Sequence, residues 1–291
     1  MDFFNRLGYL INMKTGKYTI DFVQTGYFGL DGGAMFGVVP KVLWEKSIPS
    51  DNLNRITLGT RMPVIRSGSR IIIIDTGIGE YWDEKFNDRF SVDHTEFTPY
   101  GGLKQLGITP ADVTDVVLTH LHFDHTGGSV ISEGGKWIPA FPNAKYHMHQ
   151  KQFDWAKEPS PKDKGSFASE RFVPLAEEGV ASFFEGSINL DDEIQLIETN
   201  GHTFGHLLVK LTDSSSSYLF CSDLIPTSAH VPLPFIMGFD LQPLLTLDEK
   251  SKFLNDAVEE NTTLLFQHDT EYTGATVKKV DNGFAVNELI K

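Results

Sequence analysis

Four metal-ligand side chains follow directly on one apolar strand, and this arrangement constrains the fold more than any other feature of the sequence. Residues 115–119 are β-branched and apolar like a buried strand, and His120, His122, Asp124 and His125 come next, before two glycines break the strand. Because side chains alternate faces along an extended chain, His120 and His122 point the same way and can share one metal ion. Asp124 and His125 lie where the chain turns and can reach a second ion. This mixture of imidazole and carboxylate favours zinc, with iron or manganese as alternatives.

A site with two metal ions needs more ligands than this run supplies, and later strand ends offer them. Three further strand-like runs are each followed by histidine or aspartate, namely His202, Asp223 and His268. Each of these residues alone is a weak signal. The repeated pattern, however, is what a site on one edge of a β-sandwich requires.

Strand-like runs dominate both halves of the chain, at residues 18–23, 55–58, 70–75, 115–119, 144–149, 193–198, 206–211, 218–222 and 262–266. Between them, Thr98 followed by Pro99 predicts the start of a helix that Gly107 ends. The Thr-Leu-Asp-Glu pattern at residues 246–249 is typical of a capping box, and it predicts a helix running to about residue 260. The apolar stripe of this helix predicts that it packs against a sheet.

Charge and composition limit the partners and the compartment. The formal charge of −14, with no basic patch, argues against a nucleic-acid or anionic-membrane partner. The single cysteine, Cys221, cannot form an internal disulfide, which favours a reducing compartment. There is no signal-peptide pattern and no apolar stretch of about 18 residues, so we expect a soluble, cytoplasmic protein.

The domain organisation is expected to be simple. No linker or repeat divides the chain, which predicts one domain over residues 17–291. Residues 1–16 would be an N-terminal extension, and Met13 could be a second start site.

With these residues in order, the chain resembles the metallo-β-lactamase fold hydrolases. The signature His-x-His-x-Asp-His of that family stands at residues 120–125. Its Gly-His-Thr-x-Gly-His segment places the next ligand on His202, with Phe204 in place of the commoner proline. Its bridging aspartate matches Asp223, and its last histidine matches His268.

The resemblance implies an α+β fold, the four-layer αββα sandwich, and a site with two divalent metal ions per chain. It assigns the ligands as follows: one metal takes His120, His122 and His202, the other takes Asp124, His125 and His268, and Asp223 bridges them. It also implies that Asp75, in an Asp-Thr-Gly segment, orients a ligand histidine from behind.

Within the family, the resemblance is closest to the branch of lactonases and organophosphate hydrolases such as methyl parathion hydrolase. Residues 31–37, which include Phe36, resemble a loop that walls the active site in that branch, and a plain glycine-rich turn is the alternative interpretation. Homoserine lactonases carry a tyrosine three residues after the bridging aspartate, and Pro226 stands there instead. His230, four residues further along, is a candidate for the missing donor and for the pocket wall, although a surface position fits it equally well.

Several other residues are interpreted as structural. His147 and His149 are expected on a partly exposed strand, and His94 is expected to be solvated. His206 is expected to be a hydrogen-bonded packing residue, and Cys221 a small buried hydrophobe.

The function expected from these residues is hydrolysis of an ester-type bond (a lactone, a carboxylic ester or a phosphotriester) by a hydroxide that bridges two metal ions. Asp124 would take or return the proton, and the substrate would be a small molecule with an acyl or aryl portion. A homodimer is left open. The alternatives on the same fold are a thioester hydrolase of the glyoxalase II type and a persulfide dioxygenase with a single iron. The acidic charge argues against a nuclease, and the number of ligands argues against a purely structural metal site.

Overall fold

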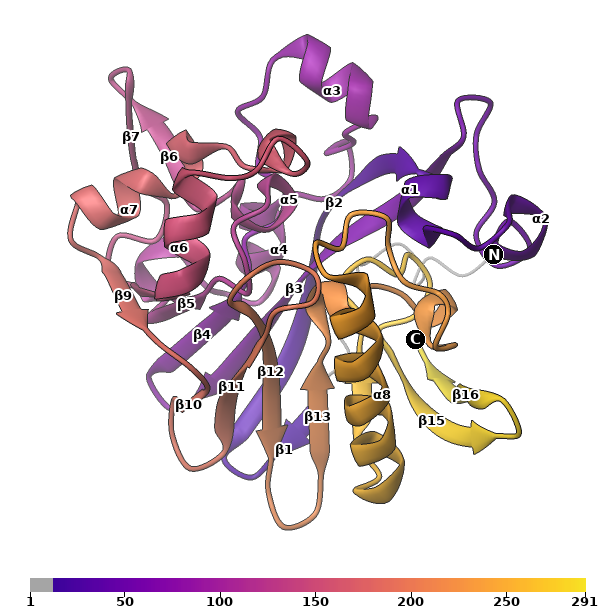
Figure 1. The fold of residues 1–291 in the computed structure, drawn as a ribbon. Coiled ribbons are helices and arrows are strands. Elements are labelled where there is room, and N and C mark those ends of the chain that lie inside the picture. The colour runs from indigo at the N-terminus through magenta and orange to yellow at the C-terminus, as the bar shows by residue number, and fades with distance from the viewer. Residues whose placement is uncertain (1–12) are drawn as a thin grey trace, which may run out of the picture. The chain divides into compact units, whose positions relative to one another are not determined.

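The computed structural model describes residues 13–291, and the chain forms two compact units. Among the described residues, the first unit contains residues 13–27 together with Thr60–Phe184, and the second contains Phe28–Gly59 together with Glu185–Lys291. The boundaries fall within two long strands, β2 (Tyr18–Asp31) and β3 (Arg55–Ser67). Figure 1 shows both units as sheets with helices beside them.

The first seven-stranded sheet has the order β1-β2-β3-β4-β5-β8-β9. Its other strands are β1 (Met13–Thr15), β4 (Arg70–Ile74), β5 (Asp115–Val117), β8 (Lys145–His149) and β9 (Ala181–Phe184). Strands β4, β5, β8 and β9 pair in parallel, so their carboxyl ends share one edge of the sheet. The residues that follow β4 and β5 are therefore brought together at that edge.

The helices of the first unit are α3 (Glu84–Phe90), α4 (Pro99–Gln105), α5 (Phe123–Thr126), α6 (Gln150–Lys157) and α7 (Val173–Glu177), and a hairpin is formed by β6 (Val130–Glu133) and β7 (Lys136–Pro139). The core joins sheet residues such as Val116 and Tyr146 to Leu103 of α4, Phe153 of α6 and Leu175 of α7. Burial of these apolar side chains is what holds the helices on the sheet.

The second seven-stranded sheet comprises β10 (Ile188–Asn189), β11 (Ile194–Thr199), β12 (His206–Thr212), β13 (Ser217–Phe220), β14 (Thr263–Leu265), β15 (Gly274–Val280) and β16 (Gly283–Ile290), in that order. Only the β13–β14 pair is parallel. A parallel pair needs a crossover, and α8 (Pro243–Glu259) lies in it. Phe253, Leu254 and Ala257 of α8 pack into the core of this unit, as the stripe predicts.

Short helices complete the described part of the chain. They are α1 (Gly32–Phe36) and α2 (Lys41–Trp44), and the 3-10 helices η2 (Pro110–Asp112), η3 (Lys164–Ser166), η4 (Ser169–Arg171), η5 (Ser222–Leu224) and η6 (Ser228–His230). Among residues 13–291, no helix is both long enough and apolar enough to cross a membrane.

The nine predicted strands are all present, and α4 begins after Thr98 as predicted. The predicted capping box at residues 246–249 is wrong, because α8 already begins at Pro243. Glu249 instead accepts hydrogen bonds from the backbone N–H groups of Asn200 and Gly201, at 2.8 and 2.9 Å. The sequence pattern fitted a cap, but the carboxylate is used to hold a distant loop.

The predicted extension at residues 1–16 overlaps the fold, because Met13–Thr15 forms β1 and pairs with β2. Residues 1–12 of that extension lie outside the described residues. The single domain over residues 17–291 stays a prediction.

The histidines interpreted as structural are more buried than expected. His147 and His149 are 8% and 2% exposed, so the prediction of a partly exposed strand is wrong. His147 Nε2 lies 2.8 Å from the carboxylate of Asp115, and His149 Nδ1 accepts from the N–H of Lys151 at the start of α6. The alternation of side chains in the sequence did not show that both buried rings have hydrogen-bond partners.

His94 is likewise half-buried rather than solvated, with Nε2 at 2.8 Å from the carbonyl oxygen of Gly79 and Nδ1 at 3.0 Å from that of Thr25. The prediction for His206 is confirmed: the ring is buried, and its Nδ1 lies 2.7 Å from the hydroxyl of Thr199. Cys221 is buried as predicted.

Candidate metal centre

Seven histidine and aspartate side chains among the described residues are candidate metal ligands, and they are the seven that the sequence singles out. Four follow β5 in the first unit: His120, His122, Asp124 and His125. Three belong to the second unit: His202, Asp223 and His268. All seven side chains are buried.

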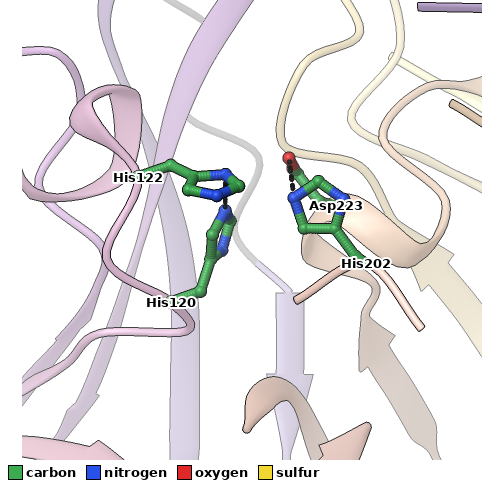
Figure 2. Close-up of side chains that lie close together, drawn as sticks. All are labelled: His120, His122, His202 and Asp223. Atoms are coloured by element: carbon green, nitrogen blue, oxygen red, sulfur yellow. Dashed lines mark hydrogen bonds and ion pairs between the residues drawn. The ribbon is translucent and has the colours of Figure 1, made fainter. Parts of the chain in front are cut away.

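In the first unit, the ligands lie where β5 gives way to a single helical turn. His120 and His122 precede α5, and Nε2 of His120 lies 3.0 Å from Nδ1 of His122 (Figure 2). Asp124 and His125 lie within α5, where the carboxylate of Asp124 is 3.6 Å from Nε2 of His125. Because the chain changes from extended to helical here, Asp124 and His125 do not follow the alternation that applies to His120 and His122.

The turn after α5 depends on glycine. A β-carbon at Gly127 would lie 1.8 Å from the carbonyl oxygen of Ile78, so only glycine lets the two backbones approach this closely. Thr76 in the same segment donates from its N–H and its hydroxyl to the carbonyl oxygen of His125, at 2.8 and 2.9 Å. These contacts fix the backbone of the ligand loop against the segment that follows β4.

Asp75 holds the ligand loop from behind. Its side chain is fully buried and accepts from the N–H of Thr119 at 2.7 Å and from the hydroxyl of Thr119 at 2.8 Å. Its second oxygen also lies 2.9 Å from Nδ1 of His125. A carboxylate at this position keeps the proton on Nδ1 and leaves the lone pair of Nε2 for a metal. Asp75 itself has a φ of 56°, a left-handed conformation that aspartate tolerates better than most residues.

In the second unit, the carboxylate of Asp223 lies between two histidines. One oxygen is 3.3 Å from Nε2 of His202, and the other is 3.1 Å from Nε2 of His268 (Figure 2 shows the first of these pairs). The N–H of Asp223 donates to Nε2 of His206, which places this residue at the end of β13. One carboxylate with a histidine at each oxygen is the arrangement that a bridging metal ligand needs.

The outer nitrogens of these histidines are held as well. Nδ1 of His202 lies 2.9 Å from the carboxylate of Asp240, and Nδ1 of His268 lies 2.7 Å from the carbonyl oxygen of Gly59. Sequence reasoning did not identify Asp240, because it follows no strand and belongs to no motif. Its position in a loop rich in apolar residues gives no local signal of its role.

The donor set fits divalent metal ions. It consists of imidazole and carboxylate groups, and three of the histidines have an oxygen acceptor at Nδ1, which would leave Nε2 as the ligand atom. Zinc, iron and manganese all accept such ligands.

Phe36 and His230, predicted as pocket residues, are both fully buried within the second unit. Their rings stack with centroids 4.4 Å apart. Nε2 of His230 donates to the carbonyl oxygen of Met35 at 2.9 Å, and Nδ1 accepts from the hydroxyl of Thr227 at 2.8 Å. Burial lowers the pKa of His230 to about 3, so the ring is neutral. Both ring nitrogens are engaged, and the idea that His230 donates to a substrate oxygen is not supported.

An aromatic cluster surrounds the residue between His122 and Asp124. It consists of Phe123 with Trp82, Phe86 and Phe90, whose ring centroids lie 6.2, 5.2 and 4.8 Å from that of Phe123. All four residues belong to the first unit. Phe123 is buried, so these rings pack against the ligand loop at a position next in sequence to two candidate metal ligands.

Comparison with known proteins agrees with this geometry. Residues 62–268 match the model of the metallo-beta-lactamase superfamily. The N-acyl homoserine lactonase AttM of Rhizobium radiobacter is 28% identical over 213 residues, which cover 70% of this chain and 73% of AttM.

Solved structures give the same result. A probable metal-dependent hydrolase from Staphylococcus aureus superposes with a TM-score of 0.87 and 29% identity, covering 96% of this chain and 98% of that one. AidC, described as a dizinc quorum-quenching lactonase, has a TM-score of 0.78 at 20% identity, with coverage of 95% and 96%. The predicted α+β fold of this superfamily is confirmed.

Proposed function

The chain belongs to the metallo-β-lactamase superfamily of metallo-hydrolases, and from this we propose that it hydrolyses an ester-type bond with the help of two divalent metal ions. The observation that carries the proposal is the carboxylate of Asp223, with Nε2 of His202 at one oxygen and Nε2 of His268 at the other. A structural zinc site closes with four ligands, whereas seven candidate ligands are available here.

The proposed ligand sets are those that the sequence resemblance implies. His120, His122 and His202 would hold one ion, and Asp124, His125 and His268 would hold the other. Asp223 would bridge the two ions. We propose zinc for both sites, with iron or manganese as the alternatives.

When bound, such a pair of ions lowers the pKa of a water molecule and polarises the carbonyl or phosphoryl oxygen under attack. The chain's own residues would do the rest. Asp124 offers a carboxylate that can accept the proton of the attacking water and return it to the leaving oxygen. Asp75 and Asp240 keep the protons of His125 and His202 on Nδ1, so that both rings remain fixed in tautomer and direction.

The aromatic cluster around Phe123 supports the proposed substrate class. Its rings offer an apolar surface beside the ligand loop, which suits a substrate with an acyl or aryl portion. A lactone, a carboxylic ester and an aryl phosphotriester all meet this requirement. The lactonase AttM, as a relative, supports the lactone.

Long-chain acyl-homoserine lactones are not the preferred substrate in this proposal. Pro226 occupies the place of the tyrosine that assists the lactone carbonyl, and proline has no donor to offer there. His230 does not replace the donor, since its nitrogens bond to Thr227 and Met35. Losing one donor to a developing oxyanion typically costs about 2.7–4 kcal/mol.

The test combines metal analysis with a substrate panel. We expect two metal ions per chain, and a higher kcat/KM for aryl esters, aryl phosphotriesters or simple lactones than for a long-chain acyl-homoserine lactone. One iron per chain with no second metal would replace the proposal by the dioxygenase alternative. Activity confined to thioesters would favour the glyoxalase II alternative, and a dominant kcat/KM for the acyl-homoserine lactone would refute the assigned consequence of Pro226.

A further inference from the structure

Arg171 is an unusual residue in the interior of the first unit. It is the last residue of η4, and it is only 2% exposed. The guanidinium carbon lies 4.3 Å from the ring centroid of Trp82 and 4.1 Å from that of Trp137, so the charged group is held between two indole rings. Its Nη2 donates to the carbonyl oxygen of Tyr81, whereas Nε and Nη1 have no hydrogen-bond partner among residues 13–291.

A buried arginine with unpaired N–H groups is energetically unfavourable at this position. A buried N–H group without a partner destabilises the folded state, and apolar residues often replace buried charges without loss of stability. Two aromatic rings offset part of this destabilisation, because the negative face of each ring attracts the cation. We therefore infer that the arginine contributes little to the stability of the fold. Its main effect is to fix the positions of the two tryptophans.

Trp82 connects this arrangement to the aromatic cluster. Its ring also stacks on Phe86 of α3, with centroids 4.0 Å apart and planes within 10°. Phe86 and Phe90 then contact Phe123 of the ligand loop. Guanidinium, indole and phenyl rings thus form a continuous series of contacts that ends beside the candidate metal ligands.

Helix α3 depends on these contacts more than an ordinary helix would. None of its seven residues is fully buried, and Phe86 and Phe90 are only half-buried. In Figure 1, α3 stands clear of the strands of its own unit. An element with so little burial opens easily unless it is fixed at one end, and Arg171 contacts two residues that closely precede α3, Tyr81 and Trp82.

We propose that Arg171 is a positioning residue that holds Trp82 and α3, and thereby keeps Phe86 and Phe90 against Phe123 as the surface that receives the apolar portion of the substrate. The assignment to substrate rests on the proposed function. The role in holding α3 does not, and it can be tested separately.

The first test measures the position of α3 directly. In Arg171→Met, which keeps the length of the side chain and removes the charge, we expect the amides of residues 81–90 to exchange hydrogen about tenfold faster than in the wild type. We expect the metal content and the exchange of β4 and β5 to stay the same. Arg171→Lys keeps the charge but not the planar group, and should show the same loosening, so the conclusion does not depend on one variant folding well. Lys157→Met is the matched control, since it also removes a cation from an aromatic ring, that of Phe153, 4.9 Å away.

The second test measures the effect on substrate with two lactones that differ only in their apolar chain, γ-butyrolactone and γ-dodecalactone. Arg171→Met should raise KM for the long-chain lactone about tenfold, with a much smaller effect on kcat and on the short lactone. Unchanged exchange in residues 81–90 would refute the inference even if the enzyme is a lactonase. Faster exchange without hydrolysis of any ester by the wild type would refute the proposed function and leave the role of Arg171 in holding α3 intact. An equal rise in KM for both lactones would refute the assignment of this surface to the apolar chain.

Discussion

Replacing Asp75 by asparagine should weaken metal binding although no metal ligand is removed. The carboxylate accepts from the N–H and the hydroxyl of Thr119 and faces Nδ1 of His125 at 2.9 Å. An amide has one acceptor oxygen, which can stay with the N–H of Thr119, and an NH₂ group that would then meet the proton on Nδ1 of His125. The proton is expected to move to Nε2, where it competes with the metal. Loss of such an outer partner typically costs about 10–100-fold in metal affinity, or about 1.4–2.7 kcal/mol.

The assay is a zinc titration of the apo-protein in competition with a chromophoric chelator at fixed pH. Asp115→Asn is the matched control, because Asp115 also receives a threonine hydroxyl, from Thr114 at 2.8 Å, and lies 2.8 Å from a histidine nitrogen, that of His147. His147 is not a candidate ligand, so this variant should lower the thermal stability and leave the zinc affinity as it is. Wild-type affinity in Asp75→Asn, or an equal loss in both variants, would show that the carboxylate does not act through His125.

Three further predictions concern the ligands and their surroundings. His122→Ala and His202→Ala should each empty one metal site and nearly abolish turnover. His149→Ala should lower the stability by about 1 kcal/mol, because the cap of α6 is lost, and elemental analysis should still find both ions. Asp223→Ala should lose both metals together and unfold at a lower temperature, since metals that bind only the folded state stabilise it; an unchanged metal content would place the bridge elsewhere. His230 should make the protein sensitive to acid: the unfolded state takes up a proton near pH 6.5 and the folded state only near pH 3, so the free energy of unfolding falls as the pH drops between these values. His230→Gln, whose amide can still donate to Met35, should show a smaller loss in urea unfolding at pH 4.5 relative to pH 7, and an identical loss would contradict the buried neutral ring.

Much of the fold could be predicted because its signals are local. Strand runs such as 115–119 and 206–211 are visible in a few consecutive residues, and so is the start of α4 at Thr98 and Pro99. The capping-box pattern at residues 246–249 failed for the same reason. A short pattern does not show that Glu249 has better partners at Asn200 and Gly201, nearly fifty positions away.

The sequence by itself determined the residue types and spacing of the candidate ligands, because a strand followed by a turn dictates which side chains can share an ion. Only the tertiary structure decided how each ligand is held. The acceptor for Nδ1 of His125 is Asp75, which lies 50 residues earlier in the sequence. The acceptor for His202 is Asp240, 38 residues later, and the acceptor for His268 is the carbonyl oxygen of Gly59, 209 residues earlier. Such partners leave no pattern in the sequence, since any carbonyl or carboxylate can accept a hydrogen bond once the folded chain brings it close enough. The same holds for Arg171, whose place between Trp82 and Trp137 follows from packing alone.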